Sequence, residues 1–178
     1  MKHSPWSALR GATIRIALPA CAVVLAAACN SDQADVQDAN ELKEARELRE
    51  LKQQEATNIV VVRKCIDLLF TQKNLVRAKA ECFGDVYIQH NPAAANGTDA
   101  MVANLTKMFA ENPQMSFEVK RTAAEQDMVW VHSHAKFTPN STGLAVVDIF
   151  RMKDGRVVEH WDVIQPVPAA SANDNTMF

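Results

Sequence analysis

The spacing of apolar residues along this chain changes from a helical period to a strand period near residue 115. Three stretches before that point place apolar side chains at helical spacing: residues 57–70, 75–82 and 98–110. The stretches with strand character are residues 86–90, 116–123, 128–137 and the two arms of 143–168. Helices grouped before an antiparallel run of strands predict an α+β fold, in which the helices cover one face of the sheet.

The longest strand-like stretch, residues 143–168, predicts a β-hairpin that turns at Lys153-Asp154-Gly155. A two-residue turn would separate Asp148 from His160 and Asp162, which would lie on the other face. A three-residue turn, with Gly155 left-handed, shifts the register by one and places Asp148 opposite His160, with Asp162 on the same face. Because this second register pairs opposite charges and avoids like ones, we predict it.

The predicted hairpin face therefore combines two carboxylates and an imidazole with apolar neighbours. Its members are Val146, Asp148, Phe150, Val158, His160, Asp162 and Ile164. In such a pocket burial raises the pKa of a carboxyl group and an adjacent imidazolium lowers it, so either effect can tune a proton-transfer group. The alternative is a hydrogen-bonded polar pair that only seals a core.

The first 28 residues predict a secretory signal, with three basic residues followed by an apolar run too short to span a bilayer comfortably. The run ends in Ala26-Ala27-Ala28-Cys29, which resembles the bacterial lipobox, in which cleavage precedes an acylated cysteine. We therefore expect a lipoprotein anchored at Cys29, facing the periplasm, with the outer membrane preferred. Without residues 1–28 the chain keeps 16 basic and 21 acidic residues, a formal charge of −5, and no basic block indicates nucleic-acid binding.

Residues 29–56 predict a tether and spacer. Residues 30–40 are polar and acidic without an apolar period and predict disorder. Residues 41–55 carry an acidic, a basic and a narrow Leu/Ala stripe, which indicates a solvated helix; a coiled coil is the alternative. The globular domain is expected at 57–168, and 169–178 as a disordered tail.

Two cysteines flank the predicted turn near Lys73 between the first two helices. Cys65 lies eight residues before it and Cys82 nine after, so they come level in an antiparallel helix pair. In an oxidising compartment, thiols at this distance form a disulfide. The alternative is a pair of small buried apolar residues.

Two motifs together resemble the SnoaL-like branch of the nuclear transport factor 2-like superfamily. They are Tyr87-Ile88-Gln89-His90-Asn91-Pro92 and the hairpin stretch from Asp154 to Val163 with its Glu-His-Trp-Asp core. The resemblance covers residues 57–167. It implies a curved antiparallel sheet, about four long strands plus a short one, wrapped as a cone around three N-terminal helices, with a pocket at its mouth.

The resemblance also implies a range of activities. Members include polyketide cyclases, and relatives include ketosteroid isomerase and scytalone dehydratase, while many members only bind ligands; homodimers through the sheet are common. In the cyclases an acid on the late strands performs acid/base catalysis, which corresponds to Asp162 here. In the isomerases the base precedes a proline at a strand-to-loop corner, which fits His90 or Asn91.

Further pocket candidates are the histidines and aromatic residues of the predicted sheet: His132, His134, Trp130, Tyr87 and Phe150. His132-Ser133-His134 has metal-ligand spacing, with His160 or Asp148 as a third ligand, but this spacing alone is weak and we predict no metal. Phosphate-binding loops and nucleophile motifs are missing from the sequence, so we expect no cofactor.

Two hypotheses follow. The first is a cofactor-free isomerase, dehydratase or aldol-type cyclase acting on a small apolar carbonyl compound. In it Asp162 is the acid/base, His160 and Asp148 orient or tune it, and His90 is a second proton-transfer group. The second hypothesis is a lipid-anchored binding or assembly module with the same fold and no turnover.

Overall fold

The structure is a computed structural model that describes residues 20–178, with side chains from residue 35 onward. Most of the predicted signal peptide and the side chain of Cys29 lie outside these described residues. The chain divides into two compact units, residues 1–46 and 47–178. Among the described residues no helix is both long and apolar enough to cross a membrane.

Helix α1 runs from Ala20 to Ile66 without a break and continues into one π-helical turn, η1, Asp67–Thr71. This differs from the predicted disordered tether at 30–40 and from the predicted helix start at Thr57. No Gly or Pro occurs between residues 20 and 66 to end the helix. Side-chain pairs at i,i+4 spacing, such as Gln37 and Glu41, support its polar turns.

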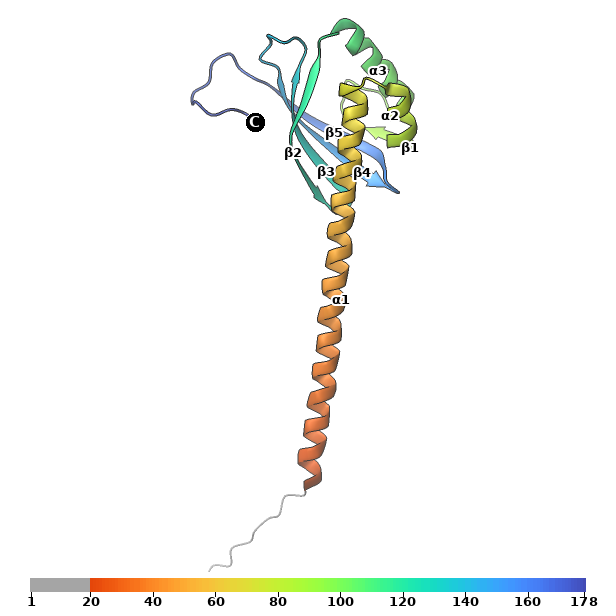
Figure 1. Ribbon diagram of the computed structural model, residues 1–178, viewed down its shortest axis with the longest axis vertical. Coiled ribbons are helices and arrows are strands. Elements are labelled where there is room, and N and C mark those ends of the chain that lie inside the picture. The colour runs from red at the N-terminus through yellow and green to blue at the C-terminus, as the bar shows by residue number, and fades with distance from the viewer. Residues whose placement is uncertain (1–19) are drawn as a thin grey trace, which may run out of the picture. The chain divides into compact units, whose positions relative to one another are not determined.

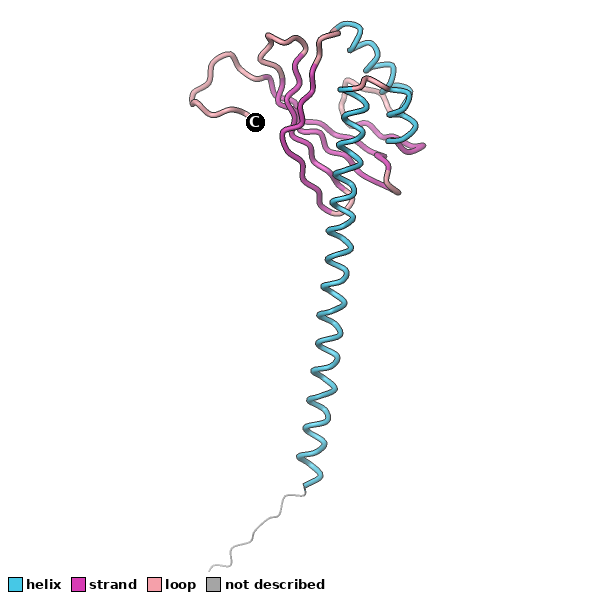
Figure 2. The backbone as a smooth tube through the Cα atoms, viewed as in Figure 1, coloured by secondary structure: helices cyan, strands magenta, loops and turns pink. Residues whose placement is uncertain are grey.

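The second unit is an α+β domain in which helices line the concave side of a curved sheet (Figure 1). Helices α2, Leu75–Cys82, and α3, Thr98–Glu111, agree closely with the predicted stretches. The five strands are β1 Phe83–Gln89, β2 Ser116–Glu125, β3 Met128–Lys136, β4 Leu144–Lys153 and β5 Arg156–Pro166. Their order in the sheet is β1-β5-β4-β3-β2, and Figure 2 shows the curvature of the strands.

Strand β1 departs from the predicted antiparallel sheet, because it pairs in parallel with β5. The strand predicted at residues 86–90 begins earlier, before Gly84. Helix α2 passes directly into β1 at Phe83. A Cβ atom at Gly84 would lie 3.0 Å from Cγ1 of Val158, so the small residue permits close packing of β1 on β5.

The β4–β5 turn contains two residues, not the predicted three. Asp154 and Gly155 have φ values of 51° and 72°, as a type I′ hairpin turn requires. Arg151 pairs with Glu159 whereas Met152 pairs with Val157, so Val158 is an extra, bulged residue. Because of this bulge, Asp148 lies on the same face as His160 and Asp162, as was predicted from a three-residue turn.

The consequence is that Asp148 lies opposite Asp162, not opposite His160, which pairs with Phe150. Asp148, His160 and Asp162 nevertheless share one face of the sheet, as predicted. Val158 does not belong to that face.

The core lies between the helices and the concave face of the sheet, and its most buried members include Val62, Leu68, Val129, Val131 and Val157. The end of α1 is also bound to the β2–β3 turn: Glu55 accepts a hydrogen bond from the backbone N–H of Gln126 at 2.9 Å, and Asn58 donates to its carbonyl at 3.3 Å. These contacts attach α1 to the end of the sheet at which β2 turns into β3.

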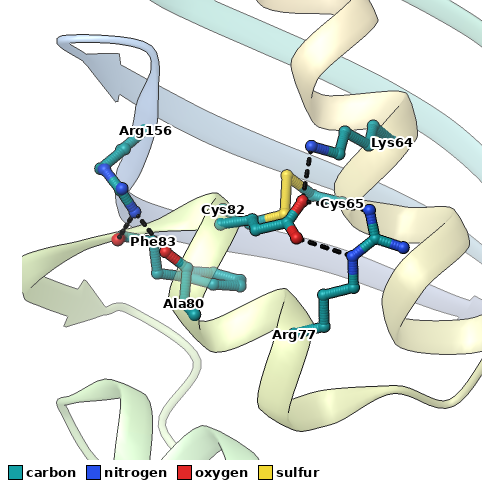
Figure 3. The surroundings of a disulfide bond; sticks show 8 residues. Lys64, Cys65, Arg77, Ala80, Cys82, Phe83 and Arg156 are labelled. Atoms are coloured by element: carbon teal, nitrogen blue, oxygen red, sulfur yellow. Dashed lines mark hydrogen bonds and ion pairs between the residues drawn. A yellow bond between two sulfur atoms is a disulfide. The ribbon is translucent and has the colours of Figure 1, made fainter.

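A disulfide joins Cys65 at the end of α1 to Cys82 at the end of α2, with Cα atoms 5.6 Å apart (Figure 3). The ion pair of Glu81 with Lys64 connects the same two helices beside it, and Glu81 also pairs with Arg77 within α2. On the other side, Arg156 donates to the carbonyl oxygens of Ala80 and Phe83. The junction of α2 and β1 is therefore fastened to both α1 and β5.

The last residues, predicted to be a disordered tail, form no helix or strand. Their end is nevertheless in contact with the sheet, because the ring of Phe178 stacks on His134 with ring centres 4.2 Å apart.

Candidate active site

A cavity of about 250 Å³ lies between the helices and the concave face of the sheet. Most of its wall is apolar and comes from both layers, including Leu69, Phe70, Met101, Leu105 and Phe117. Its polar groups are Tyr87, Gln89, Asn91, Asn104, Asp148, His160 and Asp162. A cavity that is mostly apolar with a few polar groups is typical of a small-molecule site.

Strand β1 and the loop after it supply three of these groups at alternate positions, because side chains of a strand alternate between the faces of the sheet. Tyr87, Gln89 and Asn91 line the cavity. The backbone holds this corner in place: the N–H of Gly97 donates to the carbonyl of Tyr87, and the N–H of Gln89 donates to Oδ1 of Asn96.

Asp162 faces an amide whose orientation is fixed. The backbone N–H of Ala93 donates to Oδ1 of Asn91 at 2.8 Å, so Nδ2 of Asn91 must face the other way. It lies 3.0 and 2.7 Å from the two carboxylate oxygens of Asp162. Asn91 therefore donates to both carboxylate oxygens of Asp162.

His160 and Asp148 form a buried pair. Nε2 of His160 lies 3.0 Å from Oδ1 of Asp148, and the side chains are 11% and 13% exposed. A hydrogen bond between these two atoms requires a proton on one of them. The pair therefore holds a proton at the cavity wall, next to the carboxylate of Asp162.

Burial shifts the pKa values of two groups near this proton, Asp148 and Tyr87. It raises the pKa of Asp148, which the hydrogen bond to His160 partly offsets and the charge of Asp162 reinforces. The pKa of Tyr87 is raised by burial and by the charges of Asp148 and Asp162, so the phenol stays neutral and can act as a donor.

The position of His90 corrects its predicted role. The ring does not line the cavity and lies on the outer face of the sheet, where it stacks on Trp161 with centres 4.4 Å apart. Its Nε2 lies 2.7 Å from Glu159, which Arg151 also contacts. Gln89 and Asn91 face inward on either side, so alternation turns His90 away from the reaction site.

The predictions for β3 need the same correction. Val129, Val131, Ser133 and Ala135 are buried on the inner face, which places Trp130, His132 and His134 on the outer face. Nε2 of His134 bonds the carbonyl oxygen of Thr142, and Phe178 covers both imidazoles. These two histidines cannot share a metal ion with Asp148 or His160 across the sheet.

Within the part of the chain whose side chains are described, Asp148, His160 and Asp162 are the one group with a spacing suited to a metal ion, since their donor atoms lie within 4.8 Å of one another. An ion there would have to replace the proton between His160 and Asp148 and the amide contact of Asp162. Shared protons account for the contacts described here, and a cofactor-free site stays a prediction.

Gln89 was not among the predicted site residues, although it contacts both His160 and the backbone of the β1 corner. Its Oε1 lies 3.0 Å from Nδ1 of His160 and accepts from the backbone N–H of Asn91 at 2.9 Å. The signal was present in the alternation of Tyr87, Gln89 and Asn91, which a prediction centred on His90 overlooked.

Residues 62–160 match the sequence profile of the SnoaL-like domain, and no curated protein sequence matches the chain. Three solved structures are similar to it in fold. A candidate ketosteroid isomerase from Kribbella flavida has 15% sequence identity and a TM-score of 0.55, over 67% of this chain and 85% of that one. A candidate polyketide cyclase from Bacillus cereus has 16% identity and a TM-score of 0.53, over 61% and 74%.

The third similar structure is AclR, a candidate hydroxylase from Streptomyces galilaeus, with 22% identity and a TM-score of 0.51, over 62% of this chain and 90% of that one. Identities this low establish a shared fold and nothing about the reaction.

Proposed function

This chain belongs to the SnoaL-like domain family, and from that premise and the geometry of the cavity we propose that it catalyses proton transfer on a small, largely apolar carbonyl compound. The observation that carries the proposal is a carboxylate, Asp162, beside the proton that His160 and Asp148 share. An acceptor and a donor on one apolar wall are what enolisation requires.

In the proposed reaction Asp162 takes a proton from the substrate carbon next to the carbonyl group. The electron pair of that C–H bond forms the double bond of the enol. The His160–Asp148 pair gives its proton to the carbonyl oxygen. With a β,γ-unsaturated ketone, isomerisation follows when Asp162 returns its proton to the γ-carbon and the enol oxygen returns its proton to the His160–Asp148 pair, which restores the carbonyl group. Loss of a β-hydroxyl as water, or attack of the enol on a second carbonyl, would give a dehydratase or an aldol-type cyclase from the same first step.

The volume and lining of the cavity also limit the size and charge of the substrate. Its volume of about 250 Å³ is below the roughly 300–1,000 Å³ of sites for drug-sized ligands, so the substrate is small. Among the residues whose side chains are described, no Lys or Arg lines the cavity. An anionic group would therefore be buried near Asp162 without a counter-ion, which is strongly unfavourable. A neutral ketone or aldehyde fits both limits.

One observation favours the alternative, a binding module without turnover. At the corner before Pro92, where the resemblance to the isomerases implies a base, Asn91 faces the cavity and His90 does not. The catalytic proposal thus depends on Asp162 alone as the base.

The cellular part of the proposal is a lipid anchor at Cys29 that holds the protein in the bacterial envelope, facing the periplasm and preferring the outer membrane. The lipobox-like sequence supports it, and so does the Cys65–Cys82 disulfide, because disulfides persist in oxidising compartments. A homodimer paired through the sheet stays a prediction, which sedimentation would check.

Substitution of the proposed base tests the catalytic proposal. Asp162→Asn should lower turnover of an accepted ketone by roughly 10²–10⁴-fold while the fold stays intact. Asp148→Asn should cost less, because Asp148 acts through His160. The control is Asp154→Asn, the same chemical change in the exposed β4–β5 turn. Equal turnover by Asp162→Asn and the control would contradict the proposal.

A further inference from the structure

Gln89 lies between the β1 corner and His160, and the orientation of its amide is not free. The backbone N–H of Asn91 can only donate, and it lies 2.9 Å from the oxygen of the Gln89 amide. The other end of the same amide, Nε2, lies 3.3 Å from the hydroxyl of Tyr87. The oxygen of Gln89 is therefore the atom that meets His160.

This orientation determines which nitrogen of His160 carries a hydrogen. Nδ1 of His160 lies 3.0 Å from the Gln89 oxygen, which only accepts, so Nδ1 must be protonated. A neutral imidazole that donated from Nε2 to Asp148 would leave Nδ1 bare and place two acceptors, Nδ1 and the Gln89 oxygen, against each other.

We propose that Gln89 is a positioning residue that keeps His160 protonated at Nδ1 and thereby gives the His160–Asp148 pair one proton more than a neutral histidine beside a carboxylate would hold. Two states satisfy the contacts: an imidazolium beside the Asp148 carboxylate, or an Nδ1–H imidazole that accepts from protonated Asp148. Both have zero net charge, and in both the pair can release a proton and Asp162 can accept one.

The surroundings support retention of this extra proton. His160 is 8% exposed, so water cannot easily replace the contact with Gln89. In the described part of the chain, the charged and titratable groups that face the pair are Asp162 beside it on β5 and the neutral phenol of Tyr87 on β1, and no Lys or Arg side chain lines the cavity. The carboxylate of Asp162 makes loss of the proton less favourable.

The inference rests on the proposed function and assigns its two roles, the His160–Asp148 pair as the acid and Asp162 as the base. Its test nevertheless needs no substrate. The full chain is labelled with ¹⁵N-histidine, and the ring nitrogens of His160 are followed by NMR through neutral pH, with His160→Gln to assign the signal. We expect Nδ1 to carry hydrogen throughout. A neutral ring with a bare Nδ1 would overturn the inference.

Two variants distinguish the hydrogen-bonding role of the Gln89 amide from an effect of its packing. Gln89→Leu removes the acceptor and should shift the ring signals to the neutral form protonated at Nε2. Gln89→Glu retains an acceptor and should keep Nδ1 protonated, and it remains informative if the leucine variant fails to fold. Gln165→Leu, the same change at an exposed position of β5, is the control and should leave the spectrum unchanged.

A folded Gln89→Leu protein whose His160 signals match the wild type would also overturn the inference. Nδ1 protonation in a protein that turns over no ketone would leave the role of Gln89 intact and remove the catalytic proposal instead.

Discussion

Asp148 and Asp162 lie directly opposite each other on β4 and β5, and both line the cavity. Two like charges in opposite positions of a sheet are destabilising unless other groups compensate. Here His160 contacts the first carboxylate and Asn91 the second. A pair that costs stability and is held by dedicated partners is the kind of feature that functional sites retain.

The disulfide should make a large contribution to stability. Replacement of both Cys65 and Cys82 by Ala should lower the free energy of unfolding by about 3 kcal/mol, because the bridge closes a loop with a sequence separation of 17. Urea denaturation with and without reductant measures this. Reductant should destabilise the wild type and leave the double variant unchanged. Two alkylated thiols in protein isolated from an oxidising compartment would contradict the bridge.

Glu159 should govern part of the acid sensitivity. Its hydrogen bond to His90, reinforced by Arg151, lowers the pKa of Glu159 from 4.5. A lowered folded-state pKa gives stability that is present above the unfolded value and is lost as pH falls through the folded value. Glu159→Gln should therefore cost about 1 kcal/mol at neutral pH and flatten the loss of stability below pH 4.5.

Urea denaturation from neutral to acid pH checks the role of Glu159, with Glu125→Gln on β2 as the matched control. If the free energy of unfolding falls as steeply at acid pH in Glu159→Gln as in the wild type, groups other than Glu159 control the acid sensitivity.

Much of the fold could be predicted because it rests on local signals. The bounds of α2 and α3 follow apolar spacing and their flanking residues, and alternation places His160 and Asp162 on one face of β5. Whether Asp148 shares that face depends on the register of the hairpin. The turn was predicted wrongly, and the bulge at Val158 cancelled the error. Val158 is a strand-forming residue like Val157 before it, so the sequence carries no sign of the extra residue.

The side chains of β3 show a second limit. In His132-Ser133-His134 every member is polar, so alternation cannot tell which face is inner. The structure buries Ser133, the smallest of the three, completely, without a hydrogen-bond partner for its hydroxyl. Burying one hydroxyl costs less than burying two imidazoles, and Val129, Val131 and Ala135 follow it inward.

The lipid anchor can be tested directly in cells. Cys29→Ser should move the protein from the detergent phase of a phase-separating extraction to the aqueous phase, because the variant lacks the acylated thiol. Cys21→Ser, a change of the same type within the predicted signal sequence, should leave the protein in the detergent phase. Wild-type protein found in the aqueous phase would contradict the anchor.

The most direct measurement of the central claim is deuterium incorporation at the α-carbon of small neutral cyclic ketones in heavy water, followed by NMR. The account predicts that the wild type accelerates exchange above the buffer rate, that Asp162→Asn lowers the enzymatic rate by roughly 10²–10⁴-fold, and that Asp154→Asn keeps it. Leu144→Trp, which fills the cavity, should abolish it, whereas Val147→Trp on the other face of β4 should not. Ketones that bind the wild type yet exchange no faster than in buffer would contradict catalysis and leave a binding protein.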